Sequence, residues 1–94
     1  TANFFCSDFY AFQATRFFLK KGVSIPDDLS IAGFDDNKFA QYSYPTLTTV
    51  HQDVKARGKA AVDMLDSIIQ GRIIENRVQT FSVSITKRGS TRKI

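Results

Sequence analysis

Residues 29–36 read Leu29-Ser30-Ile31-Ala32-Gly33-Phe34-Asp35-Asp36. This stretch predicts an apolar strand that ends in two carboxylates. Upstream, residues 2–6 form another short apolar segment. Residues 9–21 between the two carry apolar side chains at helical spacing, and Gly22 follows as a helix stop. A strand, a helix and a strand in about 33 residues predict a βαβ unit, whose two strands are parallel.

The downstream half continues the same alternation. Residues 46–50 are rich in β-branched side chains and predict a strand, after a polar and aromatic loop over residues 35–45. Residues 54–70 predict a helix with one apolar face, ended by Gly71. Residues 78–85 alternate with period two and predict a last strand. The sequence therefore predicts an α/β fold, an open parallel sheet with flanking helices.

Composition narrows the class of protein. The 94 residues are 43% hydrophobic and 23% charged, which is typical of one small globular domain. The net charge of +4 lies in the last eight residues, whereas residues 1–86 carry equal numbers of acidic and basic side chains, so we expect no nucleic-acid-binding face. Cys6 is the only cysteine and favours a reducing compartment, the cytoplasm. No apolar run approaches the about 20 residues of a membrane span.

Carboxylates follow both strands of the βαβ unit. The first strand leads into Ser7 and Asp8, and the second into Asp35 and Asp36. Because the carboxyl ends of parallel strands share one sheet edge, we expect these residues near each other. A carboxylate accepts strong hydrogen bonds from neighbouring hydroxyls, so the edge suits a polyhydroxy ligand. Asp35 is the first candidate, while Asp8 is either a ligand residue or a helix cap.

Catalytic chemistry has little support. His51 and Glu75 are the only histidine and glutamate, and His51 has no second ligand at metal-binding spacing. We expect His51 to be a hydrogen-bonded structural residue. The sequence holds no phosphate loop and no nucleophile motif, so we expect no enzyme, no metal and no cofactor. A sugar hydrolase that uses Asp8 and Asp35 stays open as an alternative.

Residues 39–44 form an aromatic-rich segment without a core period. Tyrosine suits positions that are apolar on one side and wet on the other, so this segment is a candidate subunit interface or cleft wall. Ordinary loop packing is the alternative.

Four ordered blocks of sequence resemble the lactose/galactose-repressor family of bacterial transcription regulators. The blocks lie in residues 7–22, 25–36, 45–61 and 88–91. They read Ser7-Asp8 with Ala11, Leu19 and Gly22; Ile25-Pro26-Asp27-Asp28-Leu29-Ser30-Ile31-Ala32-Gly33-Phe34-Asp35-Asp36; Pro45-Thr46-Leu47-Thr48-Thr49-Val50-His51-Gln52 with Gly58 and Ala61; and Arg88-Gly89-Ser90-Thr91.

The resemblance implies a position in a larger protein. It implies the C-terminal part of an effector-binding core with a two-lobed, periplasmic-binding-protein-like (type I) fold. Residues 1–50 would belong to the C-terminal lobe. Residues 51–81 would be a hinge crossing with a helix and a strand of the N-terminal lobe, and residues 82–94 would return to the C-terminal lobe and form the tail.

The resemblance also implies roles for single residues. Asp35 matches the family's acceptor of effector hydroxyls, Ser7 stands where many members have Asn, and Gln52 lies at a hinge position that faces the cleft. With Asp8, these are the candidate ligand residues. The predicted dimer interface comprises Phe12, Tyr42 and Ser43.

The function that follows from the resemblance is effector sensing and dimerisation in a cytoplasmic repressor. The expected partners are a small-molecule effector, a carbohydrate in the first place, and a second copy of the protein. Operator DNA would bind only through an N-terminal domain outside this chain, and no membrane is involved. The alternatives are a fragment of a periplasmic sugar-binding protein and a pure dimerisation module. We also expect both helices to expose apolar faces, which a missing sheet would cover.

Overall fold

The computed structural model describes all 94 residues. The chain divides into two compact units, which we describe separately. The sheet unit comprises Thr1–His51 and Ser84–Ile94, and the helix unit comprises Gln52–Val83. The bounds of the units fall within two residues of the predicted division at 51–81; which lobe each unit represents remains a prediction.

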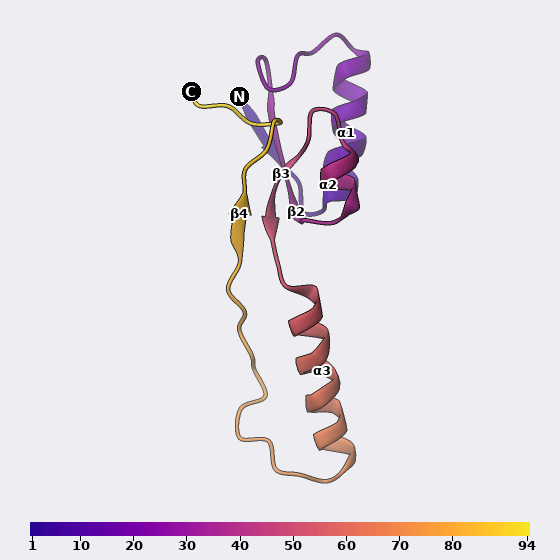
Figure 1. The fold of residues 1–94 in the computed structure, drawn as a ribbon, viewed down its shortest axis with the longest axis vertical. Helices are drawn as coiled ribbons and strands as arrows, with labels where there is room; N and C mark the ends of the chain where they lie inside the picture. The colour runs from indigo at the N-terminus through magenta and orange to yellow at the C-terminus, as the bar shows by residue number, and fades with distance from the viewer. The chain divides into compact units, whose positions relative to one another are not determined.

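The sheet unit is built on four strands, β1 (Ala2–Phe4), β2 (Ser30–Asp35), β3 (Thr48–His51) and β4 (Ser84–Thr86). They lie in the order β1-β2-β3-β4 (Figure 1). The pairs β1–β2 and β2–β3 are parallel, as predicted. The pair β3–β4 is antiparallel, so the sheet is mixed rather than parallel throughout. The reason is the connection: the chain leaves the unit along β3 and comes back along β4. The predicted α/β fold, an open sheet with flanking helices, is confirmed.

Helix α1 (Asp8–Lys20) belongs to the sheet unit and packs against β2. It begins where the Ser7 Oγ accepts a hydrogen bond from the Phe9 N–H at 3.2 Å, and it ends before Gly22, whose φ is +82°. Ala11 and Thr15 are its buried contacts with the interior. The core is small and apolar; its fully or almost fully buried members are Ala11, Ile25, Leu29, Ile31, Ala40 and Leu47.

A short helix, α2 (Lys38–Tyr42), lies inside the segment that was predicted to be a loop. The Asn37 Oδ1 caps it by accepting a hydrogen bond from the Phe39 N–H at 3.0 Å. Five residues are too few for a helical apolar period to be visible in the sequence, which explains the error. Helix α2 packs against α1, and Ala40 is buried there.

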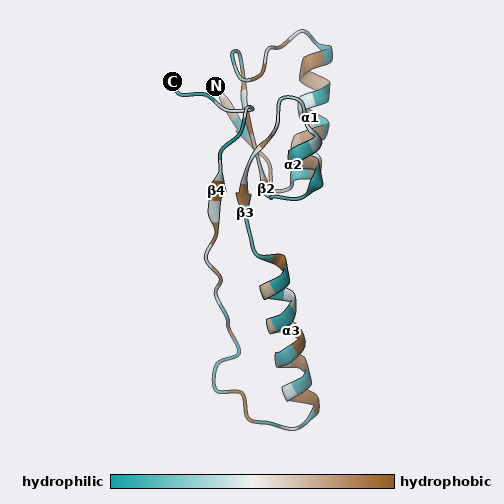
Figure 2. Cartoon of the chain, in the orientation of Figure 1, coloured by the Kyte–Doolittle hydropathy of each residue, from teal (hydrophilic) through white to brown (hydrophobic).

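The helix unit consists of α3 (Val54–Ile69) and the extended segment after it. The Asp53 Oδ1 caps α3 by accepting from the Ala56 N–H at 2.9 Å, and Gly71 follows its end with a φ of +72°. Hydrophobic and hydrophilic residues alternate along α1 and α3 (Figure 2). No residue of α3 is buried, and its apolar residues Val54, Val62, Leu65, Ile68 and Ile69 are exposed.

The prediction of a strand over residues 78–85 is wrong for most of its length. Only Ser84–Thr86 forms a strand, because only this part finds a partner, in β3. Alternation in the sequence favours an extended chain, but a strand also needs a neighbour for its N–H and C=O groups. None of the helices is long and apolar enough to cross a membrane.

Candidate functional site

The carboxyl ends of β1 and β2 meet at one edge of the sheet, as predicted from the βαβ pattern. The two strands are paired in parallel, with Phe4 opposite Ala32. The Asp8 Oδ2 accepts a hydrogen bond from the Asn37 N–H at 2.9 Å. This bond joins the segment that follows β1 to the segment that follows β2, so Ser7, Asp8 and Asp35 all belong to this edge.

Asp8 serves the protein interior. Its side chain is fully buried, and its second oxygen, Oδ1, accepts a hydrogen bond from the Thr49 Oγ1 at 2.5 Å. Both carboxylate oxygens therefore have partners within the chain, and Ser7 rather than Asp8 caps the helix. Full burial and these internal hydrogen bonds favour a structural role for Asp8, and its role as a ligand residue stays a prediction.

Asp35 and Asp36 hold an unusual backbone conformation at the end of β2. Their φ angles are +119° and +60°, and they are the only residues other than glycine with positive φ. Such conformations are costly for residues with a Cβ and persist only when surrounding contacts enforce them. They cluster at functional sites, so this strand end is the site's most unusual feature.

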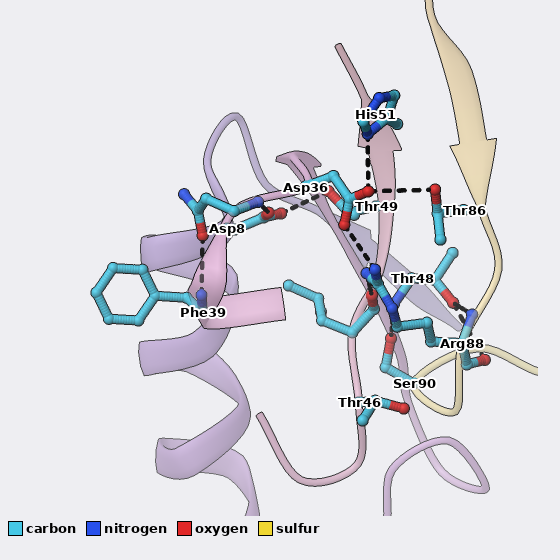
Figure 3. A network of polar contacts seen from close by, with 12 residues as sticks. Asp8, Asp36, Phe39, Thr46, Thr48, Thr49, His51, Thr86, Arg88 and Ser90 are labelled. Carbon is cyan, nitrogen blue, oxygen red and sulfur yellow. Dashed lines mark hydrogen bonds and ion pairs between the residues drawn. The ribbon is translucent and has the colours of Figure 1, made fainter. Parts of the chain in front are cut away.

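Three elements converge on the carboxylate of Asp36 (Figure 3). Arg88 Nη2 lies 2.7 Å from Oδ1, and His51 Nδ1 lies 2.8 Å from Oδ2. The Thr86 Oγ1 donates a longer bond of 3.5 Å to Oδ2. Burial alone would raise the pKa of Asp36, but the hydrogen bonds from Arg88 and His51 outweigh it and hold the pKa below its ordinary value. The expectation that His51 is a hydrogen-bonded structural residue is confirmed.

The C-terminal segment is held to the strands of the sheet unit by hydrogen bonds. Arg88 Nη1 donates to the Leu47 carbonyl at 2.9 Å. The buried Ser90 Oγ donates to the Ile31 carbonyl at 2.5 Å and accepts from the Thr48 N–H at 2.8 Å. The Arg-Gly-Ser-Thr block thus ties the tail to β2 and β3. Sequence reasoning singled out the block but did not reveal that Asp36, His51 and Arg88 meet, since they lie far apart in the chain.

The remaining candidate ligand residues, Ser7 and Gln52, are placed as follows. Ser7 is half-buried at the start of α1, where its Oγ already accepts from the Phe9 N–H. Gln52 is half-buried in the helix unit, where its Oε1 accepts from the Arg57 guanidinium.

The predicted dimer residues divide into two groups. Phe12 belongs to an aromatic cluster on α1 and α2, in which the Phe39 ring lies 5.5 Å from the Phe12 ring and 5.2 Å from the Phe9 ring. Tyr42 is 72% exposed and available to a partner. Ser43 is only 3% exposed in this chain, and its place on an interface stays a prediction. Ser43 directly follows α2, and its small side chain is buried.

The described side chains include no group of three or more His, Cys, Asp or Glu residues that could hold a metal ion. The site as built is an edge of carboxylates and hydroxyls, which suits hydrogen bonding to a neutral, hydroxyl-rich ligand.

Residues 1–91 match the periplasmic binding protein-like domain family. The chain belongs to this family. Among its relatives in the family, an HTH-type transcriptional regulator from the aml 5′ region of Streptomyces limosus is 38% identical over 85 residues, 90% of this chain and 24% of the relative. The HTH-type transcriptional repressor PurR of Photobacterium profundum is 33% identical over 94 residues, 100% of this chain and 28% of the repressor.

Solved structures of the family agree in fold. A complex of the transcriptional regulator CelR with cellobiose matches with a TM-score of 0.89 and 27% identity, over 95% of this chain and 27% of CelR. The lac repressor dimer bound to operator and an anti-inducer matches with a TM-score of 0.85 and 33% identity, over 97% and 32%. The resemblance to the lactose/galactose-repressor family is therefore confirmed. The chain spans about a quarter of the length of the curated relatives it matches.

Proposed function

We propose that this chain is the effector-sensing and dimerisation part of a transcriptional repressor of the lactose/galactose type. The single observation that carries the proposal is the enforced, positive-φ backbone of Asp35 and Asp36 at the carboxyl edge of the sheet. Ligands of open α/β sheets bind at this edge, and strain of this kind is kept where it serves a function. The relatives, which are transcriptional regulators, support the same function.

The effector we propose is a carbohydrate. Asp35 is the acceptor for neighbouring sugar hydroxyls, because an ionised carboxylate forms charge-assisted hydrogen bonds with them. Ser7 and Gln52 are the further candidate contacts. The structural neighbour CelR is in complex with cellobiose, which supports a sugar in this class of site. The fully engaged carboxylate of Asp8 is left out of the proposed ligand set.

The mechanism is a shift between two states of the whole protein. A sugar that binds one state more tightly favours that state, and operator affinity changes by the same differential free energy. Operator binding belongs to a part of the protein outside this chain. We propose homodimerisation through Phe12 and Tyr42, no catalytic step, and a cytoplasmic location in keeping with DNA as the partner.

The experiment is calorimetric titration of the full-length protein with a panel of neutral sugars that includes cellobiose. The wild type should bind at least one sugar, and Asp35→Asn should weaken that binding at least tenfold. Asp63→Asn, on the exposed face of α3, is the matched control and should leave affinity unchanged. Failure of every sugar to bind the wild type, or equal binding by Asp35→Asn, would contradict the proposal.

Two of the alternatives, the hydrolase and the periplasmic fragment, give different results in the same set of assays. A hydrolase that uses Asp35 would release free sugar from an aryl glycoside, and Asp35→Asn would stop that release. A fragment of a periplasmic sugar-binding protein would bind sugar but show no sugar-dependent operator binding. The relatives with helix-turn-helix names favour the repressor over both.

A further inference from the structure

The Asp36 carboxylate contacts β3 and β4, the two strands that connect the sheet unit to the helix unit, and it also contacts the C-terminal segment. Asp36 follows β2, and its partners His51, Thr86 and Arg88 come from β3, β4 and the C-terminal segment. Its side chain is only 12% exposed and that of Arg88 only 19%, whereas His51 is half exposed.

The partners of Asp36 stand at special places along the chain. His51 is the last residue of β3 and of the first part of the sheet unit, and Ser84 is the first residue after the helix unit. The two are paired directly across the ladder, and Thr86 lies two residues further along β4. The Asp36 carboxylate therefore contacts both strands close to the points where they connect to the helix unit.

The same residue fixes the backbone beside the candidate ligand acid. With φ values of +119° and +60°, residues 35 and 36 hold a conformation that their own preferences oppose. The side chain of residue 36 is held by an ion pair with Arg88 and a hydrogen bond with His51. The direction in which Asp35 is presented depends on this turn, because Asp35 immediately precedes it.

We propose that Asp36 is a positioning residue for effector binding. Its carboxylate fixes the turn that presents Asp35 and locks this turn to the two connections, β3 and β4. Asp36 itself does not touch the effector. The proposal rests on the proposed role of Asp35 as effector acceptor, and it adds a residue whose loss weakens binding through Asp35 alone.

The test uses full-length protein and the variant Asp36→Asn. Asparagine keeps the shape of the side chain and tolerates positive φ as well as aspartate does. The substitution removes the charge and turns one of the two acceptor oxygens into an NH2 donor, so Arg88 and His51 cannot both keep their bonds to residue 36. Two quantities are measured on the folded protein: hydrogen–deuterium exchange of the amides without ligand, and affinity for cellobiose and the other sugars of the panel. The matched control is Asp63→Asn, which removes a carboxylate from an exposed ion pair.

We expect exchange at residues 35–38, 49–51 and 84–86 to become at least tenfold faster, with residues 8–20 unchanged. Sugar affinity should fall at least tenfold, and the double variant Asp35→Asn with Asp36→Asn should bind no more weakly than Asp35→Asn alone. Unchanged exchange at these residues, equal acceleration throughout the sheet unit, or additive losses of affinity would overturn the proposal.

Exchange also separates this proposal from the function on which it rests. If no sugar binds the wild type, the proposed function fails, while the exchange data still decide whether Asp36 holds the turn. If Asp36→Asn does not fold, His51→Val replaces it, since His51 is half exposed and lies at the strand end. This variant removes one of the three partners and should accelerate exchange at residues 35–38 by at least threefold; unchanged exchange would overturn the proposal.

Discussion

Gly33 and Asp8 show how one missing side chain makes room for another. A Cβ on Gly33 would overlap the Asp8 Oδ1 and approach the Leu47 Cδ2 to 3.0 Å. The Asp8 carboxylate can therefore lie over β2 and bond to Thr49 and Asn37 only because residue 33 is glycine. The glycine of the Gly-Phe-Asp-Asp motif is thus required by packing, because the Asp8 carboxylate lies against it.

Gly33→Ala should destabilise the protein by about 1–3 kcal/mol, because the added Cβ would overlap a buried carboxylate that two hydrogen bonds hold in place. Urea unfolding of the full-length protein measures the loss. Gly89→Ala is the control, since its nearest neighbour, the Pro45 Cβ, would lie 3.4 Å away, at an ordinary contact distance. Equal effects of the two substitutions would show that the Asp8 contact does not matter.

Asp36 should make stability depend on acid pH. The folded-state pKa of Asp36 lies below its ordinary value near 3.8, so the ionised carboxylate stabilises the fold above about pH 4. This contribution is lost as pH falls through the lowered folded-state pKa. The stability difference between wild type and Asp36→Asn should be about 1–3 kcal/mol at pH 7 and should shrink below pH 4. A difference that is constant from pH 7 to pH 3 would contradict this account.

The C-terminal segment acts at the scale of the element as a fastener for the central strands. It has little regular structure, yet Ser90 is fully buried and bonds to the backbone of both β2 and β3. The Thr48 Oγ1 adds bonds of 2.9 Å from the Arg88 N–H and 2.8 Å with the Thr91 Oγ1. Residues 88–91 are therefore held to the sheet, because their polar groups bond to the backbone of β2 and β3.

Ser90→Ala should cost about 1–3 kcal/mol of stability, because the Thr48 N–H and the Ile31 carbonyl lose a buried partner. Thermal unfolding of the full-length protein checks this. Ser84→Ala, at an exposed position on β4, serves as the control and should change stability by less than about 0.5 kcal/mol. A small effect at Ser90 would mean that water replaces the hydroxyl without loss.

Sequence reasoning was reliable for elements that carry their own local pattern. Helices α1 and α3 have caps, apolar faces and glycine stops, and both form within one residue of the predicted bounds. It failed where structure depends on a distant neighbour. Residues 78–83 have a strand pattern but no partner strand, and the meeting of Asp36 with His51 and Arg88 depends on how three separate segments come together.

At the scale of the whole molecule, large apolar surfaces remain uncovered in this chain. The aromatic cluster on α1 and α2 and the apolar residues of α3 are exposed, which confirms the expectation from the sequence. Surfaces of this kind on both units indicate that the chain functions with further protein around it. The chain also spans only about a quarter of the length of the curated relatives it matches.

Tyr42→Asp should convert a dimer of the full-length protein into monomers, because it places a charge in an aromatic surface proposed as the interface. Sedimentation at micromolar concentration measures the change, and we expect at least a tenfold rise in the dissociation constant. Lys87→Asp alters charge more strongly at an exposed site of the same unit and should leave the dimer intact. A dimer that survives Tyr42→Asp would place the interface elsewhere.

The most direct test of the central claim is the operator affinity of the full-length protein with and without the sugar that it binds. We predict that sugar changes the operator affinity of the wild type at least fivefold. The Asp35→Asn variant should lose this change but still bind the operator in the absence of sugar. A wild type whose operator affinity is indifferent to every sugar, or an Asp35→Asn variant that responds as the wild type does, would contradict the account.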